Sequence, residues 1–186
     1  NATHTANFGG TVDSTQASLV GASGADLDHQ VRTTVIAELG DHASVRASNL
    51  TIEAANNVFN RFRNSSGAIV GYESAEWNVN SGSGGLLNLP AGKANVNIVQ
   101  NTEANVGNNA DIRLLALGAG VSDLRIEAFN DVITEQKAKL DSGGAIATAK
   151  SVVELAAIQN ATVNIGSNST LLVDLGNINV GAWNNA

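Results

Sequence analysis

One short phrase recurs along the chain at long intervals. It reads IEAANNV at residues 52–58 and IEAFNDV at residues 126–132, and residues 179–186 (NVGAWNNA) lie within a third copy. Self-similarity at a long period is typical of solenoids and arrays, in which each unit buries its apolar face only against its neighbours. Asn1 and Ala2 read as a continuation of the phrase after Ala186, so we interpret the chain as a slice of a longer array.

A second anchor precedes each copy of the phrase and confirms the repeat. It consists of an aliphatic residue, a glycine, two turn formers and a small residue, and it stands at residues 39–43, 106–110 and 165–169. A glycine followed by a small and an aliphatic residue forms a third anchor, at residues 10–12, 67–69 and 144–146. The anchors keep one order each time, which is the pattern of an array.

The anchors divide the chain into approximate repeat units 1–57, 58–131 and 132–186 of a single β-solenoid segment that spans residues 1–186. A period of about 55–60 residues is long for one repeat, and it predicts several coils in each unit, about three. Roughly nine coils at about 4.8 Å spacing would give a rod of about 40–45 Å.

The middle unit is longer than the others because it carries two expansions. One is LLALGAG at residues 114–120, and the other is SGSGGLLNLPAG at residues 81–92, which contains the only proline. An insertion that leaves both flanks intact is typical of a loop or an extended strand pair on the surface. We therefore expect lateral protrusions at these two places.

Composition favours stacked strands over a conventional globular core. Aromatic residues make up only 4% of the chain, and 19 residues are glycine. Small aliphatic side chains fill a narrow core between parallel strands, and Asn and Gly tolerate left-handed backbone at turns. The net charge of −7 argues against nucleic acid or an anionic membrane as a partner, and no apolar run is long enough to span a membrane.

The chain contains neither cysteine nor methionine. Without cysteine, disulfides, thiol catalysis and thiolate metal sites are excluded together, which suits an exported repeat protein. No targeting segment is recognisable at Asn1, so we expect any export signal to lie upstream.

Alternating apolar and polar residues predict short strands throughout the chain, at residues 34–39, 43–47, 50–54, 94–99, 111–114, 124–128 and 171–175. Residues 131–159 would pass as amphipathic helix on propensity alone. The third anchor instead aligns residues 144–154 with residues 10–20, a poor helix, and on that register we predict strand there as well.

The repeat pattern resembles that of filamentous-haemagglutinin-like bacterial exoproteins. It combines the aliphatic-Gly-Asx-Asx-small turn, an alternating strand, the IEA-x-NN phrase and a glycine-led strand, and it covers essentially the whole chain. The resemblance implies a right-handed parallel β-helix from a large secreted or surface adhesin. It also implies that this part of such a protein is a shaft.

Metal and histidine chemistry have little support in the sequence. Asp26 and Asp28 alternate onto one face of a predicted strand, but two carboxylates are too few for calcium, so a weak Ca²⁺ site stays an alternative to a solvated role. The three histidines are not spaced as zinc ligands. His42 stands in a turn position that Asn109 and Asn168 fill elsewhere, which indicates a corner residue.

Stacked asparagines are expected to form a structural ladder at the corners of the coils. Amide side chains repeated from coil to coil can satisfy one another and the turn backbone. The predicted ladder comprises Asn56, Asn57, Asn108, Asn109, Asn130, Asn184 and Asn185. Glu53 and Glu127 share a repeat position with Gly181, so we interpret them as solvated outward residues rather than as a catalytic acid and base.

Aromatic and basic residues in the middle unit are candidates for surface contacts with glycans or proteins. Arg61, Arg63, Tyr72 and Trp77 are polar or amphipathic and have no counterparts in the other units. Phe129 and Trp183 share one repeat position, which favours stacking on each other.

The sequence therefore predicts a non-catalytic structural segment of an extracellular or cell-surface fibre that mediates attachment or filament formation, without a cofactor. Its expected partners are neighbouring repeats of the same or identical chains, end to end, and surface glycans or other cells. The alternative is a carbohydrate- or protein-binding module that uses the insertions near 81–92 and 114–120. A polysaccharide-processing β-helix enzyme is the least favoured reading, because the basic residues are scattered and form no cleft with carboxylates.

Overall fold

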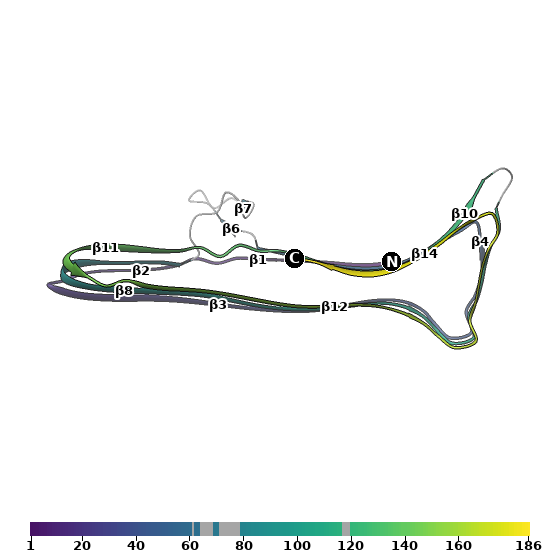
Figure 1. The fold of residues 1–186 in the computed structure, drawn as a ribbon, viewed down its shortest axis with the longest axis horizontal. Helices are drawn as coiled ribbons and strands as arrows, with labels where there is room; N and C mark the ends of the chain where they lie inside the picture. Colours follow the sequence, from purple (N-terminus) through teal and green to yellow (C-terminus); the bar gives the residue numbers. More distant parts are fainter. Residues whose placement is uncertain (61, 64–68, 71–78, 117–119) are drawn as a thin grey trace.

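The computed structural model describes residues 1–60, 62–63, 69–70, 79–116 and 120–186. These residues form strands, turns and connections without a helix, and the three larger sheets are parallel. The predicted all-β class is therefore confirmed. In Figure 1 the chain follows a long, narrow loop that bends sharply at one end and widens into a triangle at the other.

One long wall of this loop contains sheet A, which takes one strand from each passage of the chain. Within the described residues its order is β1 (Ala2–Phe8), β5 (Asn49–Asn60), β10 (Ser122–Ile133) and β14 (Gly176–Asn185). The pairing is in register, so Ala2, Ala54, Ala128 and Ala182 form one column.

Sheet B forms the opposite wall and runs around the sharp bend. Its central strand is β8 (Val79–Val106), and its outer strands are β2 (Val12–Ala17) and β3 (Val20–Leu39) on one side and β11 (Ala138–Ala147) and β12 (Lys150–Ile165) on the other. Gly85 lies at the bend, with a φ of 155°. A Cβ there would overlap the Ser18 carbonyl oxygen, so only glycine fits.

Sheet C closes the triangular end. It consists of β4 (Ser44–Ala47), β9 (Asp111–Leu114) and β13 (Thr170–Val173). A small antiparallel pair, β6 (Phe62–Arg63) with β7 (Ile69–Val70), belongs to the segment between β5 and β8.

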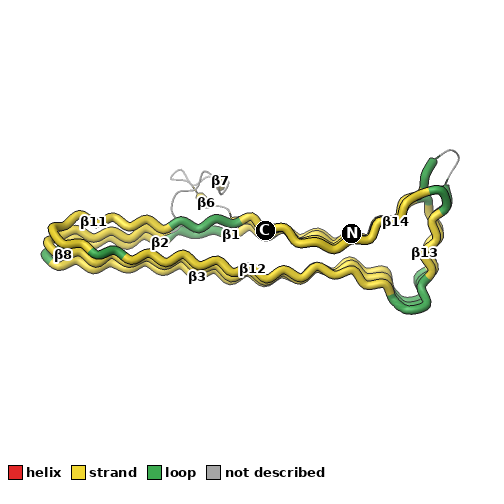
Figure 2. The backbone as a smooth tube through the Cα atoms, in the orientation of Figure 1, coloured by secondary structure: helices red, strands yellow, loops and turns green. Residues whose placement is uncertain are grey.

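We call one passage of the chain through sheets A, B and C a coil. Coil 1 comprises β1 to β4, coil 2 runs from β5 to β9, coil 3 from β10 to β13, and β14 begins a further layer on sheet A. Figure 2 shows the coils lying directly over one another along the whole loop. Inner and outer side chains alternate because the strands are pleated.

The core lies between the walls and is narrow. In the triangular end, buried aliphatic side chains of all three sheets meet, among them Ile112, Leu124 and Ile126. Further along, Val58 of sheet A packs with Val96 and Ile98 of sheet B. These fully buried residues belong to coil 2 or to β10 of coil 3, between the outer layers.

The prediction of several coils in each unit is wrong. Asn57 pairs with Asp131 and Asp131 with Asn185, so successive units lie on each other directly and each unit is a single wide coil. Strands average about five or six residues, whereas β8 has 28 and β3 has 20. Because the strands are long, one coil contains all the residues of a repeat unit. The described stack is therefore a few layers high instead of about nine.

The predicted loop at residues 81–92 is also wrong, because this stretch is the middle of β8 and is paired on both sides. The predicted alignment of the third anchor is wrong as well. Val12 pairs with Val79, and Val79 with Ala138, so residues 67–69 and 144–146 are not its counterparts. The break between β11 and β12 lies opposite Leu89 and Pro90, where proline has no N–H to donate.

The ends of the chain overlap instead of continuing each other. Ala2 stands in the column of Ala182, so residues 1–6 and residues 181–186 occupy the same stretch of the loop in different layers. The expectation that Asn1 follows Ala186 in register is therefore wrong. The expectation of strand at residues 131–159 is confirmed by the end of β10, by β11 and by β12, although their register differs from the predicted one.

Candidate functional site

The edge of the stack that coil 3 and β14 form exposes side chains whose column partners are core residues. Val96 in β8 is fully buried, whereas Leu155, its partner in β12, is 52% exposed. In sheet A, Ile126 is fully buried and its partner Val180 in β14 is 45% exposed. Column partners point to the same face of a sheet. The exposure of Leu155 and Val180 therefore marks an edge that can accept another layer.

The turn between sheets B and C is a regular ladder of side-chain and backbone hydrogen bonds. The Asn108 N–H donates to Asp41 Oδ1 at 2.6 Å, and the Ser167 N–H donates to Asn108 Oδ1 at 3.0 Å. Each coil thus provides a side-chain acceptor for the backbone of the next coil. His42, Asn109 and Asn168 follow with φ of 58°, 54° and 57°, which confirms the predicted corner position.

The glycine of this turn is required by the layer beneath it. A Cβ at Gly107 would lie 2.5 Å from the Gly40 carbonyl carbon, and a Cβ at Gly166 would lie 2.5 Å from that of Gly107. At Gly40 a Cβ would meet nothing within 4 Å. Gly40 lies in coil 1, where the described residues place no layer on that side.

Amide side chains form ladders, but most of them are not at corners. Asn130 Nδ2 donates to Asn184 Oδ1 at 2.8 Å inside the loop, and Asn185 Nδ2 donates to Asp131 Oδ1 at 2.9 Å outside it. The predicted corner positions are wrong for the following residues, which lie within strands: Asn56, Asn57, Asn130, Asn184 and Asn185. Asparagine occurs in turns and also at polar positions of alternating strands, so the residue type alone does not distinguish a corner from a strand.

The interior ladder links the two walls. Gln100 is fully buried, and its Nε2 donates to the Asn56 carbonyl oxygen at 2.9 Å, while Gln159 Nε2 donates to Gln100 Oε1 at 3.0 Å. Thr102 and Asn130 are hydrogen-bonded at 2.5 Å across the same interior. Buried polar groups that are paired in this way favour one register over its neighbours.

An ionic and aromatic cluster covers the outer face of sheet A. Arg125 contacts Glu127 directly and approaches Glu53 at 3.7 Å. The hydrogen bond with Glu127 is the main cause that raises the pKa of Arg125, against the effect of desolvation. Glu127 is only 2% exposed, so the interpretation of this glutamate as solvated is wrong. Arg125, which pairs with it, lies two residues away on the same strand face.

Phe129 and Trp183 form the aromatic part of this cluster. Their rings are stacked with centroids 5.7 Å apart and an interplanar angle of 5°, as predicted from their shared repeat position. The Trp183 ring lies over Gly181, where a Cβ would be 2.9 Å from it. Trp183 remains 43% exposed and presents a flat apolar surface over Gly181, the column partner of Glu127, which Arg125 contacts.

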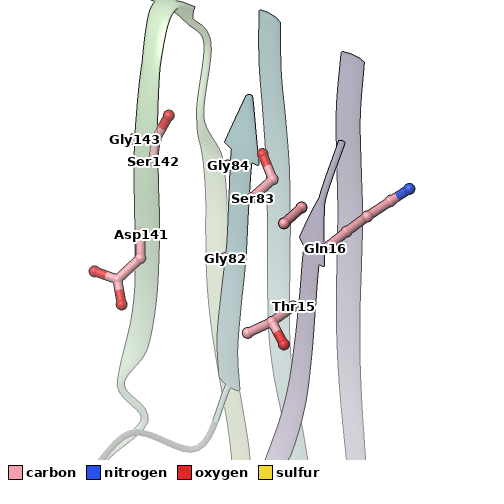
Figure 3. A pocket seen from close by; sticks show the side chains of 9 residues that line it. Thr15, Gln16, Gly82, Ser83, Gly84, Asp141, Ser142 and Gly143 are labelled. Carbon is pink, nitrogen blue, oxygen red and sulfur yellow. The ribbon is translucent and has the colours of Figure 1, made fainter. Parts of the chain in front are cut away.

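A shallow groove crosses the outer wall near the sharp bend (Figure 3). Thr15, Gly82 and Asp141 are column partners there, and the glycine leaves a hollow between two polar side chains. Ser83 and Ser142 line the groove from neighbouring positions. Its polar character suits hydrogen bonding to a hydroxylated ligand, but no basic residue lines it.

Asp26 and Asp28 both lie on the outer face of β3, as their alternation predicted. Asn95 Nδ2 donates to Asp28 Oδ1 at 3.1 Å, so this carboxylate belongs to an outer ladder. Within the described ranges, no group of three or more His, Cys, Asp or Glu side chains is placed to hold a metal ion.

Among the described residues, two titratable groups outside the cluster have shifted pKa values. Burial lowers the pKa of His29, against the opposing effect of Asp28, and its ring meets Phe8 edge-on with centroids 5.3 Å apart. Hydrogen bonds from Arg113 and then Arg46 lower the pKa of Asp111 on sheet C.

No protein-family model, curated protein or solved structure matches this chain. The part of the chain that the structure describes also contains no helix that is long and apolar enough to span a membrane.

The four predicted contact residues belong to the segment between β5 and β8. Arg61, Tyr72 and Trp77 lie outside the described residues, and Arg63 is described only as part of β6. Of the predicted insertion at 114–120, Leu114 ends β9 as a fully buried residue, and residues 117–119 lie outside the described ranges.

Sequence reasoning missed three parts of the site. It identified the glycines of the turn as an anchor without their role as close contacts between layers. It also missed the pairs of Gln100 with Gln159 and of Arg125 with Glu127. Both pairs could have been found from the sequence. Gln100 and Gln159 occupy the same column in successive coils, and Arg125 and Glu127 are two residues apart in one strand, so they share a face.

Proposed function

We propose that this chain is a non-catalytic structural segment of a large secreted or cell-surface fibrous adhesin. In this proposal the chain forms part of a right-handed parallel β-helix whose coils stack along the fibre axis. One observation carries it: the inner columns run in register through successive repeats and end in uncovered apolar side chains such as Leu155 and Val180.

The chemistry of the walls supports a structural role. Outward ladders connect the coils by side-chain hydrogen bonds, for example Asn160 to Asn101 at 2.9 Å and Asn164 to Asn105 at 2.8 Å. The interior is held by apolar columns and by paired amides. Such ladders stiffen a stack without a disulfide, and the net charge of −7 keeps its surface hydrated.

An extracellular location and attachment to other cells are part of the proposal. They are supported by the resemblance of the repeats to filamentous-haemagglutinin-like exoproteins and by the absence of cysteine. In a fibre of this kind each coil adds about 4.8 Å of length. Neighbouring coils of the same or an identical chain are then the principal partners.

A tandem chain tests the stacked architecture. Residues 1–180 followed directly by residues 1–186 place Val180 and the second Asn1 in consecutive columns, so the walls continue across the junction. Small-angle scattering should show one body whose height along the stack rises by about 14 Å for three added coils, at constant width. Two independent bodies on a flexible joint would contradict the proposal.

The second candidate function is a carbohydrate- or protein-binding module, and the outer cluster of sheet A favours it. Trp183 offers a half-exposed ring stacked on Phe129, and the Arg125–Glu127 ion pair lies on the same face of the sheet. A sugar can stack on a flat apolar ring of this kind while charged donors bind its hydroxyl groups. The stretch at residues 81–92 is paired on both sides in sheet B, and it contributes Gly82 and Ser83 to the polar groove near the sharp bend.

Binding to a glycan array decides this second candidate. Trp183→Ala should abolish binding, whereas Leu175→Ala, which removes another exposed apolar side chain, should retain it. Equal binding by both variants would remove the cluster from consideration.

A further inference from the structure

Within a single chain, no neighbouring atom requires a glycine at position 40. Gly107 and Gly166 occupy the same turn position in coils 2 and 3, and each lies against the backbone of the coil before it. A side chain at Gly40 would enter open space. Its backbone becomes constrained in the same way as soon as another turn of the same type lies beneath coil 1.

The turn of coil 3 has the groups that would lie beneath Gly40. In the existing layers, the upper N–H donates to a side-chain oxygen of the coil below, as from Asn108 to Asp41 and from Ser167 to Asn108. The corresponding donor in coil 1 is the Asp41 N–H, and the corresponding acceptor at the other edge is Ser167 Oγ. The two edges of the stack are therefore complementary at this turn.

The inner columns of the two edges also match. Coil 3 presents Leu155, Ala157 and Ile165 in columns that hold Val96, Ile98 and Val106 in coil 2. In coil 1 the same columns hold His29, Val31 and Leu39. Placed over coil 3, Val31 and Leu39 continue two apolar columns, His29 comes to lie above Leu155, and Thr33 comes to lie above Gln159 in the column of Gln100.

Resting on the stacked architecture proposed above, we propose that the coil 3 edge binds the coil 1 edge of a second copy of this chain, head to tail and in register. The Gly40 turn of the upper copy lies on the Ser167 turn of the lower copy. The repeated contact is heterologous, so it continues into a filament and does not stop at a dimer.

The overlapping ends set the condition for this contact. The fourth layer of sheet A is the place of β14 from the lower copy and of β1 from the upper copy, and both strands would occupy the columns of Ala54 to Asn57. One of the two segments, residues 1–6 or residues 181–186, leaves the sheet at each junction. The strand that stays replaces the backbone hydrogen bonds of the one that leaves.

Sedimentation velocity of the full chain over a wide dilution series tests the proposal with a matched pair of variants. Gly40→Ala adds a methyl group that is free in the single chain and collides with the backbone in the stack. Gly24→Ala adds the same methyl group in the same coil, and a Cβ at Gly24 also meets nothing within 4 Å. The column of Gly24 carries Ala91 and Lys150 in the other coils, so it tolerates a side chain in a stack.

The expected result is a sedimentation coefficient that rises with concentration for the parent chain and for Gly24→Ala but stays constant for Gly40→Ala. Mixed with the parent, Gly40→Ala should join filaments through its intact coil 3 edge and shorten them, because it cannot extend them at its coil 1 edge. Pairing of two coil 1 edges would instead give dimers of the parent that exclude Gly40→Ala, and this outcome would overturn the head-to-tail contact.

Two other outcomes also overturn the inference. One is equal assembly of Gly40→Ala and Gly24→Ala, and the other is a parent chain that remains a monomer at every concentration. Hydrogen exchange on the dilute parent separates this failure from failure of the proposed function. If β8 amides are protected and copies do not stack, only the inference fails; if β8 is unprotected, the coil architecture fails as well.

Discussion

Gly40 and Gly107 occupy the same turn position in successive coils, but only Gly107 is in close contact with the layer before it. A Cβ at Gly107 would lie 2.5 Å from the Gly40 carbonyl carbon, whereas a Cβ at Gly40 would meet nothing within 4 Å. Glycine is thus required for packing at this turn position in coil 2, whereas in coil 1 the same position has room for a side chain. This difference distinguishes the interior of the stack from its edge.

Gly107→Ala should destabilise the chain, and Gly40→Ala should not. The methyl group at position 107 forces two backbone segments apart, at a cost of about 1–3 kcal/mol or more in the free energy of unfolding. At position 40 the methyl group has space. Urea unfolding of both variants at low protein concentration measures the difference, and equal midpoints would contradict the close stacking of the turns.

Ile98→Ala should cost far more stability than Ile158→Ala. Ile98 is fully buried between the walls, and loss of a buried isoleucine side chain costs about 2–5 kcal/mol. Ile158 is 55% exposed on the outer face, where substitutions usually change stability by about 0.5 kcal/mol or less. Thermal or urea unfolding provides the test. A larger loss for Ile158→Ala would mean that the two faces of the strands are reversed.

The chain should lose stability as the pH falls below about 6.5 because of His29. Burial lowers the pKa of His29 in the folded state, so the unfolded chain takes up the proton first. Stability is therefore complete above the unfolded pKa and is lost as the pH falls from there toward the folded pKa. Asp111 adds a separate loss near and below its usual pKa of 3.8, because its folded pKa is also lowered and protonation favours the unfolded chain.

Unfolding midpoints between about pH 7 and pH 5 isolate the histidine effect from that of Asp111. His29→Val, which introduces the residue that coil 2 has at this column, should flatten the dependence in that range. His4→Asn removes a histidine from the same coil and introduces the residue of its own column, and it should leave the dependence in place. An unchanged slope in His29→Val would rule out His29 as its source.

Self-association should become stronger with added salt. In the head-to-tail contact Asp28 of the upper copy lies above Glu154 of the lower copy, since both share the column of Asn95, and like charges about 4.8 Å apart repel. Glu154→Gln should therefore assemble at lower protein concentration than the parent. Glu103→Gln removes the same charge from β8 in the middle layer and should leave assembly unchanged; identical behaviour of the two variants would contradict this register.

The fold class could be predicted from the sequence because the repeat phrase is kept at the columns that stack. Ile52 lies beside Ile126, and Phe129 beside Trp183, as their alignment indicated. The number of coils could not be predicted, because the repeat period gives the number of residues in a unit and does not say how many turns of the solenoid those residues make. The Gly-rich stretch around Gly85 has loop composition, yet the layers on both sides hold it in a strand.

The candidate site was less accessible to sequence reasoning. Stacking was predicted, but the roles of particular residues depend on the layer in which they lie. Glu127 is buried with its carboxylate bonded to Arg125 and Asn179, and Leu155 is exposed because nothing in the described chain lies on it. Neither fact follows from residue type, and both follow from the register.

Spin labels on stacked positions test the central claim, that each repeat is one wide coil lying in register on the last. The chain has no cysteine, so Asn101→Cys with Asn160→Cys can be labelled selectively on the outer wall. The account predicts strong spin exchange for this pair, whose backbones lie about 4.8 Å apart. The pair Asn101→Cys with Asn164→Cys, about 14 Å apart, should show only dipolar broadening. Exchange in the second pair, or none in the first, would contradict the account.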